Sequence, residues 1–271
     1  MASKLGTHRA ASLQRSVICG KRRFRVAVRT LLSIITCIEL FLVASLGFVF
    51  VAIVYVFTRP FDSRRVISGK ALRLVAHSAA LFSPMWRFRI HGELPNKLSP
   101  KTVCVSNHCS HTDVFLICHV PWEMKWLAKR SLFKLPFIGW GMWLVGDVGV
   151  DRGSAKALAA LEECRTWLER GVPVMIFPEG TRSKTGETQP FKDGAFKLAI
   201  DSGADVLPMA VAGTEHALSK HDWRPGFAKG VLRVGKPIST TGMTSSDLPR
   251  LKQQAFEQVQ ALRAEILPLA R

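Results

Sequence analysis

Six short runs of apolar and β-branched residues interrupt the chain after residue 85. Each run holds four to six residues and is followed by a polar or glycine-containing segment, which is typical of strands buried in a sheet. We predict strands at residues 86–91, 102–106, 124–128, 174–177, 206–211 and 231–234.

Apolar residues recur at helical spacing in two longer segments. In residues 154–170 the shared face holds Leu158, Leu161, Cys164 and Leu168. In residues 247–267 it holds Leu251, Ala255, Val259, Leu262 and Ile266. Strands interleaved with helices predict an α/β domain, which we place at residues 86–271.

The longest apolar run lies in the first third of the chain. Residues 40–57, LFLVASLGFVFVAIVYVF, are 18 positions without a charge, and residues 31–38 extend the run upstream past Glu39. At 1.5 Å per residue this length suits a hydrocarbon core of about 30 Å. We predict a membrane helix at residues 31–57 after a basic segment at 1–30; the alternative is a buried helix of a soluble protein.

Charge strengthens the membrane interpretation. The chain has 38 Lys and Arg against 20 Asp and Glu, a net charge of +18, which favours an anionic partner. Of this excess, +13 falls within residues 1–90, around the apolar run. The placement favours membrane lipids and argues against nucleic acid.

The segment at residues 62–83 mixes basic residues with apolar ones at helical spacing. This mixture predicts an interfacial or re-entrant helix. Basic residues therefore flank the apolar run on both sides, and both flanks favour the cytoplasm. A single span satisfies one flank only, whereas a hairpin inserted from the cytoplasmic side satisfies both. The six cysteines form no CxxC pair and predict reduced thiols in a cytoplasm-facing domain.

Three loops that follow apolar runs carry polar residues suited to chemistry. The first, NHCSHTD, holds His108 and Asp113. A histidine can take a proton near neutral pH, and a carboxylate improves it by fixing the tautomer and stabilising the imidazolium. Two alternatives are a helix start in which Ser110 is the N-cap and Asp113 completes a capping box, and a metal site that adds His111.

The other two loops, DRGS and PEGTRSKTG, each carry an arginine beside glycine. Guanidinium groups and backbone N–H groups in such loops can hold a phosphate. A solvated surface charge is the plainer interpretation of Arg152 and of Arg182.

The segments NHCSHTD, GVDRGS, FPEGTRS and VLPMAVAGT, in this order, resemble the four sequence blocks of the glycerolipid acyltransferases, in particular the bacterial 1-acylglycerol-3-phosphate acyltransferases. The resemblance covers residues 86–238 and implies a central mixed sheet flanked by helices, preceded by N-terminal membrane helices. It also implies that His108 and Asp113 are catalytic and that Pro208 lies on the acyl-donor side. The positions implied to bind the acceptor phosphate are Arg152, Glu179, Gly180, Thr181, Arg182 and Lys129, with Arg130 and Lys134 close to the last.

The implied reaction moves a fatty acyl group from acyl-CoA or acyl-carrier protein to the 2-hydroxyl of lysophosphatidate. It needs no cofactor and no metal, and it places the chain on the cytoplasmic (inner) membrane with its catalytic domain facing the cytoplasm. Another lysophospholipid or a lyso-ornithine lipid is an alternative acceptor. A lipid hydrolase is a further alternative, disfavoured because no G-x-S-x-G segment is present. Residues 135–145, LPFIGWGMWLV, are either an acyl-chain or membrane contact or an ordinary core helix.

Overall fold

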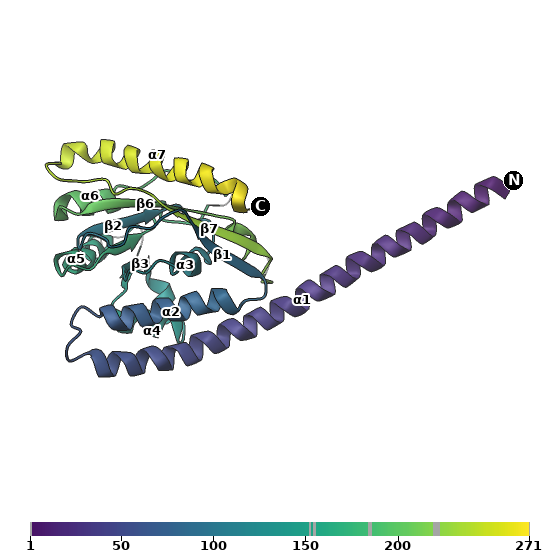
Figure 1. The fold of residues 1–271 in the computed structure, drawn as a ribbon, viewed down its shortest axis with the longest axis horizontal. Coiled ribbons are helices and arrows are strands. Elements are labelled where there is room, and N and C mark those ends of the chain that lie inside the picture. Colours follow the sequence, from purple (N-terminus) through teal and green to yellow (C-terminus); the bar gives the residue numbers. More distant parts are fainter. Residues whose placement is uncertain (1, 152, 154–155, 184–185, 219–222, 271) are drawn as a thin grey trace.

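A seven-stranded mixed sheet forms the centre of the molecule (Figure 1). The computed structural model describes residues 2–151, 153, 156–183, 186–218 and 223–270, with side chains from residue 26 onward. The sheet order is β1-β7-β6-β2-β5-β3-β4. The strands are β1 (Trp86–His91), β2 (Thr102–Ser106), β3 (Lys125–Lys129), β4 (Val148–Val150), β5 (Val174–Ile176), β6 (Asp205–Ala212) and β7 (Ala228–Val234).

Five adjacent strands run parallel, and two run in the opposite direction. β6, β2, β5, β3 and β4 pair in parallel in that order, whereas β7 pairs antiparallel with β6 and parallel with β1. All six strands predicted from the apolar runs are present, with ends shifted by up to three residues. β4 was not predicted, because three residues are too few to show a period.

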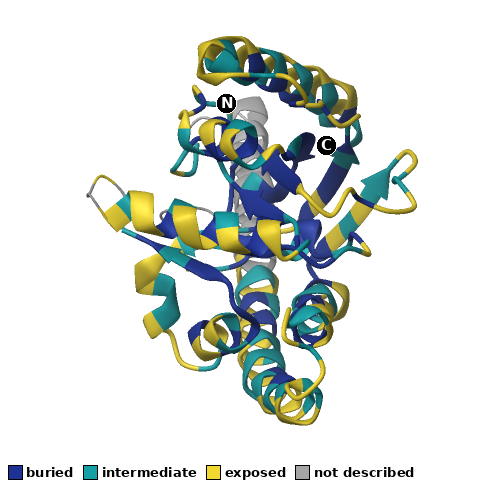
Figure 2. Cartoon of the chain, turned by 90° about the vertical axis from the view of Figure 1, so that its left-hand side faces the viewer, coloured by how far each residue is buried: buried dark blue, intermediate teal, exposed yellow. Residues whose placement is uncertain are grey.

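Helices cover both faces of the sheet, as the alternation along β2 shows. Val103 and Val105 join one buried cluster, with residues of α5 (Lys156–Glu169), α6 (Gly194–Ser202) and α7 (Leu248–Ile266). Cys104 points the other way, into a cluster with residues of α3 (Asp113–Ile117). Figure 2 shows the sheet as the buried layer between helices whose outer faces are exposed. Single-turn 3-10 helices occupy Arg130–Lys134, Thr214–His216, Ser245–Asp247 and Leu267–Ala270.

The predicted apolar faces of the two domain helices are correct in α7 and partly wrong in α5. In α7 the buried residues are Leu251, Ala255, Val259 and Ile266. In α5 Leu158 is 65% exposed, and the buried face consists of Ala160, Cys164, Trp167 and Leu168. The buried stripe is rotated because the large indole of Trp167, which the sequence analysis did not use, packs inward.

The N-terminal basic segment and the apolar run form one continuous helix, α1 (Ala2–Thr58). Figure 1 shows it running beside α2 (Val66–Phe82) and extending past the domain toward the N-terminus. Within it, residues Val26–Thr58 are long and apolar enough to cross a membrane, with a mean hydropathy of 2.7 and 6% of the window buried.

α1 contacts the domain along most of this apolar length. The Ser33 hydroxyl donates to the Pro225 carbonyl at 3.0 Å. The Phe48 ring lies 5.5 Å from that of Trp140 in α4 (Ile138–Val145), measured between centroids. Val51 is fully buried against α2 and α4. One side of α1 therefore packs against the rest of the protein.

α2 is attached to the domain by buried charges. Arg73, predicted to lie on an interfacial segment, is 8% exposed and forms an ion pair with Asp147. The Asp147 carboxylate also accepts the Trp126 backbone N–H at 3.0 Å. The Lys125 ammonium pairs with Glu123 at 2.9 Å, and Glu123 lies 3.5 Å from Arg73. Arg73 therefore faces the protein, since carboxylates there compensate its desolvation.

Candidate active site

The polar loops singled out in the sequence meet at one edge of the sheet. β2, β5, β3 and β4 are adjacent and parallel, so their carboxyl ends lie side by side. His108 follows β2, Glu179 to Arg182 follow β5, and Lys129 ends β3. Arg152 follows β4 but lies outside the described residues. The carboxyl edge of parallel strands is where α/β proteins bind ligands.

His108 and Asp113 form a hydrogen-bonded pair. The His108 Nδ1 atom lies 2.7 Å from Asp113 Oδ2, and the aspartate side chain is fully buried. β2 ends just before His108, and α3 begins at Asp113, so the intervening turn brings the carboxylate back to the imidazole. With Nδ1 bound to the carboxylate, Nε2 is the ring nitrogen left to exchange a proton with a ligand.

Further donors hold the Asp113 carboxylate in place. Its Oδ2 atom accepts the backbone N–H groups of Cys109 at 2.7 Å and Ser110 at 3.0 Å, while Oδ1 accepts the Thr214 hydroxyl. Three donors besides His108 therefore fix the orientation of this carboxylate. The capping alternative required Ser110 to be the N-cap of α3 and is wrong. The N-cap is Thr112, whose side chain makes no capping hydrogen bond. The Asp113 side chain instead points back toward the preceding loop and accepts its backbone N–H groups.

Two residues that the sequence analysis did not identify orient the histidine turn. The ring of Phe177 stacks on the His108 imidazole, with centroids 4.0 Å apart and planes at 17°. Asn107 binds β6 twice: its side-chain NH2 donates to the Val211 carbonyl at 3.0 Å, and its oxygen accepts the Val211 N–H at 2.9 Å. An asparagine directly before the histidine was the available signal for the second contact.

Cys109, next to the histidine, lies in an environment that suppresses its nucleophilicity. The residue is 9% exposed, and burial, with the Asp113 and Glu215 charges, raises the pKa of its thiol to about 12. The Asn107 side chain donates to its sulfur at 3.3 Å. Every described cysteine side chain, Cys109 included, is a free thiol.

Glu179 lies beneath the histidine turn. Its carboxylate accepts the His108 backbone N–H at 3.0 Å and also the backbone N–H of Gln189. The residue is 3% exposed, and burial raises the pKa of the carboxyl to about 7. A buried carboxylate that holds the histidine backbone supports the turn. The phosphate contact that the family resemblance implies for Glu179 stays a prediction.

The predicted phosphate-binding residues differ in accessibility. Thr181 is exposed and Arg182 is half-buried. The Arg182 charge contributes, after burial, to lowering the pKa of His111 on the neighbouring loop, so the guanidinium lies near the histidine turn. Gly180 adopts a φ of +70°, which favours glycine. A Cβ there would lie 2.8 Å from the Lys192 ammonium, a cation that sequence analysis did not identify.

The structure distinguishes the basic residues at the end of β3. Arg130 pairs with Asp151 at 2.8 Å and donates to the Gly149 carbonyl at the same distance. Lys129 is exposed at the carboxyl end of the strand. Lys129 is therefore better placed than Arg130 to bind an anion, because the Arg130 guanidinium is already bound to Asp151 and to the Gly149 carbonyl.

Pro208 and the 135–145 segment take different places. Pro208 is buried within β6, where it lies opposite Val105 of β2 and its carbonyl accepts the Gly235 N–H at 2.8 Å. Its assignment to the acyl-donor side stays a prediction. In α4, Trp140 and Trp143 are 46% and 69% exposed, so this segment is not an ordinary core helix.

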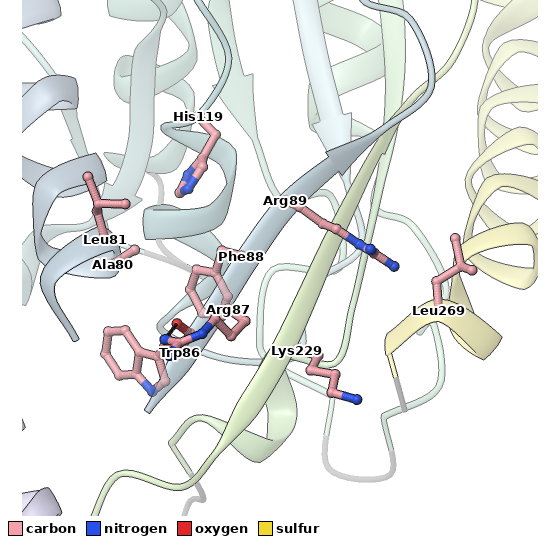
Figure 3. A pocket seen from close by; sticks show the side chains of 9 residues that line it. All are labelled: Ala80, Leu81, Trp86, Arg87, Phe88, Arg89, His119, Lys229 and Leu269. Atoms are coloured by element: carbon pink, nitrogen blue, oxygen red, sulfur yellow. Dashed lines mark hydrogen bonds between the residues drawn. The ribbon is translucent and has the colours of Figure 1, made fainter. Parts of the chain in front are cut away.

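A separate open cavity of about 740 Å³ lies around the edge strand β1. In Figure 3 Phe88 and His119 lie on one side of β1, while Arg89 and Leu269 lie on the other. The residues that line it are Ala80, Leu81, Trp86, Arg87, Phe88, Arg89, His119, Lys229 and Leu269. None of the predicted site residues that the structure describes lines this cavity, which is therefore distinct from the histidine turn.

Comparison with known proteins places this arrangement among acyltransferases. Residues 87–212 match the protein-family model described as Acyltransferase. The chain is 32% identical over 224 residues to 1-acyl-sn-glycerol-3-phosphate acyltransferase alpha of Mus musculus, covering 80% of this chain and 77% of that relative. It is also 32% identical over 192 residues to the 1-acyl-sn-glycerol-3-phosphate acyltransferase of Pseudomonas aeruginosa, covering 68% and 71%.

A relative from Chlamydomonas reinhardtii, also named 1-acyl-sn-glycerol-3-phosphate acyltransferase, is 35% identical over 166 residues, and the match covers 59% of this chain and 50% of that one. The chain thus spans about half the length of this relative and somewhat less of two plant ones. The fold is similar to the crystal structure of the 1-acyl-sn-glycerophosphate (LPA) acyltransferase PlsC from Thermotoga maritima. The TM-score is 0.66 at 24% identity, over 86% of this chain and 98% of that one.

Proposed function

Because the chain belongs to the family of 1-acyl-sn-glycerol-3-phosphate acyltransferases, we propose that it transfers a fatty acyl group to the 2-hydroxyl of 1-acyl-sn-glycerol 3-phosphate, giving phosphatidate. The single observation that supports this most is the His108–Asp113 pair, 2.7 Å apart at the carboxyl edge of the parallel strands. The donor is acyl-CoA or acyl-carrier protein.

His108 acts as the general base in this proposal. Its Nε2 takes the proton of the acceptor hydroxyl while that oxygen attacks the thioester carbonyl. The carbon–sulfur bond breaks, and the departing thiolate takes the proton from the imidazolium. Asp113 stabilises the imidazolium formed between these steps, and its other three donors keep the carboxylate in place.

The acceptor phosphate is held beside this pair. Arg182 comes from the loop after β5, whose Ser183 N–H donates to the His108 carbonyl at 2.8 Å. This bond ties the arginine loop to the histidine turn. Lys129 and Arg152, from the ends of β3 and β4, are the other proposed phosphate contacts. A guanidinium can bind two phosphate oxygens at once and so orient the acceptor before the chemical step.

We also propose that α1 lies along the membrane surface with its outer face in the lipid. Its domain contacts run from Ser33 to Val51, a rise of about 27 Å at 1.5 Å per residue, which nearly equals a hydrocarbon core of about 30 Å. If residues 33–51 of α1 crossed the bilayer, the domain surface that contacts them would lie in the hydrocarbon core. The face away from the domain is instead a continuous apolar stripe. Its members include Leu31, Ile34, Ile38, Phe41, Leu46, Val49, Ile53 and Val56, each at least 43% exposed.

This placement corresponds to insertion from one side, with both basic flanks and the catalytic domain facing the cytoplasm. The exposed Trp140 and Trp143 of α4 lie on the same side of the sheet as α1, and tryptophan is enriched at membrane interfaces. The acceptor and the product are both membrane lipids, so this side of the domain receives them directly.

The acceptor is tested by competition among lyso-lipids. Purified protein is given labelled acyl-CoA with lysophosphatidate, lysophosphatidylethanolamine and a lyso-ornithine lipid at equal concentration. We expect phosphatidate as the main product, and we expect Arg182→Ala to raise the KM for lysophosphatidate while the KM for the donor changes little. Preferred acylation of a lipid without a terminal phosphate contradicts the proposed acceptor.

A further inference from the structure

The C-terminal helix α7 contributes one cation to the loop after β5. The Arg263 Nη2 atom donates a hydrogen bond to the Gly186 carbonyl at 2.6 Å. This bond joins positions 77 residues apart. The loop is described at residues 180–183 and 186–189 and is here named the acceptor loop because it carries Arg182. Arg263 lies in none of the segments from which the family resemblance was drawn.

The same carbonyl faces the histidine turn. The Cys109 Sγ atom lies 3.8 Å from the Gly186 oxygen, within reach of a weak S–H hydrogen bond. Gly186 has a φ of +82°, so its carbonyl is presented by a backbone conformation that favours glycine. One carbonyl thus lies between the C-terminal helix and the turn that holds the catalytic histidine.

One further bond connects the acceptor loop to the histidine turn, and another lies within the loop. The Ser183 N–H donates to the His108 carbonyl at 2.8 Å, and the Gln189 side chain donates to the Arg182 carbonyl at 3.4 Å. The loop is therefore fixed on the histidine side by Ser183 and on the helix side by Arg263.

The charge of Arg263 also fits this place. Burial raises the pKa of the Glu179 carboxyl and of the Cys109 thiol, and the Arg263 guanidinium opposes both shifts. The guanidinium thus lies within electrostatic reach of the residues beneath His108. Its Nε atom is buried and has no partner among the described residues, so the contact with the loop depends on the outer nitrogens.

We propose that Arg263 is a positioning residue that holds the acceptor loop, and with it Arg182, against the histidine turn. It acts on acceptor binding through the loop and does not touch the reacting atoms. This inference rests on the proposed function, because the consequence is expressed through the acceptor phosphate.

The kinetic test compares Arg263→Ala with Arg263→Lys. Loss of a charged hydrogen bond predicts a rise of about tenfold in the KM for lysophosphatidate, with the KM for acyl-CoA nearly unchanged. Lysine can donate to one carbonyl, so it should recover part of the loss. The matched control is Arg250→Ala, an exposed arginine of the same helix that pairs with Asp247 at 2.8 Å, and it should leave both constants at the wild-type value.

Coupling to Arg182 makes the test sharper. If Arg263 acts through the loop that carries Arg182, then Arg263→Ala should have little further effect on acceptor KM in an Arg182→Ala background. The proposal would be overturned if the double variant raised the acceptor KM by the product of the two single-variant increases. An equal rise in the KM of both substrates, or an unchanged acceptor KM in Arg263→Ala, would also overturn it.

Hydrogen exchange gives a readout that does not depend on activity. Arg263→Ala should speed amide exchange in the peptide spanning residues 180–189 and leave the α5 peptide at the wild-type rate. If wild-type protein makes no phosphatidate, the proposed function fails, and exchange alone decides the inference. Unchanged exchange at residues 180–189 would then refute the positioning role.

Discussion

Cys109 is the residue that most directly separates two acyl-transfer mechanisms. A thiol beside a histidine can form a covalent acyl-enzyme when it is ionised. Here burial raises its pKa to about 12, and the His108 Nδ1 is already occupied by Asp113. We therefore predict that Cys109→Ser retains most activity and that labelled acyl-CoA alone leaves no label on the protein. Label on Cys109, with ping-pong kinetics and an inactive serine variant, would require a covalent route.

Glu179 makes the stability of the folded protein depend on pH. Its pKa is about 7 in the folded protein, above the ordinary glutamate value, so its contribution to stability is complete at acidic pH and is lost as the pH rises toward and through 7. Glutamine can still accept the His108 N–H but does not ionise.

We accordingly predict that the melting temperature of Glu179→Gln, minus that of the wild type at the same pH, increases between pH 5 and pH 8. A difference in melting temperature that stays constant over this range would show that the carboxyl does not titrate there. The comparison with wild type at each pH cancels the titration of groups common to both proteins.

At the residue scale, local sequence was sufficient for the His108–Asp113 contact and insufficient for what surrounds it. A strand-to-helix turn forces two residues five positions apart to approach, so the contact could be predicted from spacing. Thr214 and Phe177 reach the same pair from 101 and 69 positions away, and no local pattern announces them. The hydrogen bond from the His108 N–H to Glu179 was also not predicted, because a sequence does not show which side of a loop a carboxylate faces.

At the scale of elements, the buried charges between α2 and the sheet govern how the N-terminal helices are attached. Arg73 donates to the Met124 carbonyl at 3.2 Å and pairs with Asp147, and both contacts are buried. Removing one partner of a buried ion pair costs about 3 to 5 kcal/mol, because the other charge is left uncompensated.

We predict that Arg73→Ala lowers the free energy of unfolding by about this amount, measured by denaturant titration in detergent. The control is Arg165→Ala on α5, which breaks an exposed pair with Glu169 at 3.1 Å and should cost less than about 1 kcal/mol. Equal losses in the two variants would contradict the role given to the buried network.

Pattern alone located the strands better than the faces of the helices. The central strands β2, β5 and β6 are buried on both faces of the sheet, so their positions are clear from the apolar runs even where their ends are not. A helix has one buried face, and Leu158 was assigned to that of α5 although it is 65% exposed. The buried face of α5 instead holds Trp167, and the buried direction of Arg73 depends on its ion pair with Asp147, which lies in another part of the chain.

At the scale of the whole molecule, the proposed position of α1 is along one membrane surface. A protease-cleavable tag fused before residue 1 should then be digested in sealed inside-out vesicles, on the same side as the catalytic domain. Protection of the tag, with digestion of the domain, would instead show a helix that crosses the bilayer. The membrane-helix prediction from composition could not choose between these cases, because length and hydropathy are the same in both.

The central claim is that His108 transfers a proton directly between the acceptor hydroxyl and the leaving thiolate. It is tested most directly by giving purified wild-type, His108→Ala and Asp113→Asn proteins lysophosphatidate and labelled acyl-CoA, and separating the lipid products. We expect labelled phosphatidate from the wild type, almost none from His108→Ala, and a strongly reduced amount from a folded Asp113→Asn. Labelled free fatty acid as the main wild-type product, or undiminished phosphatidate from His108→Ala, would contradict it.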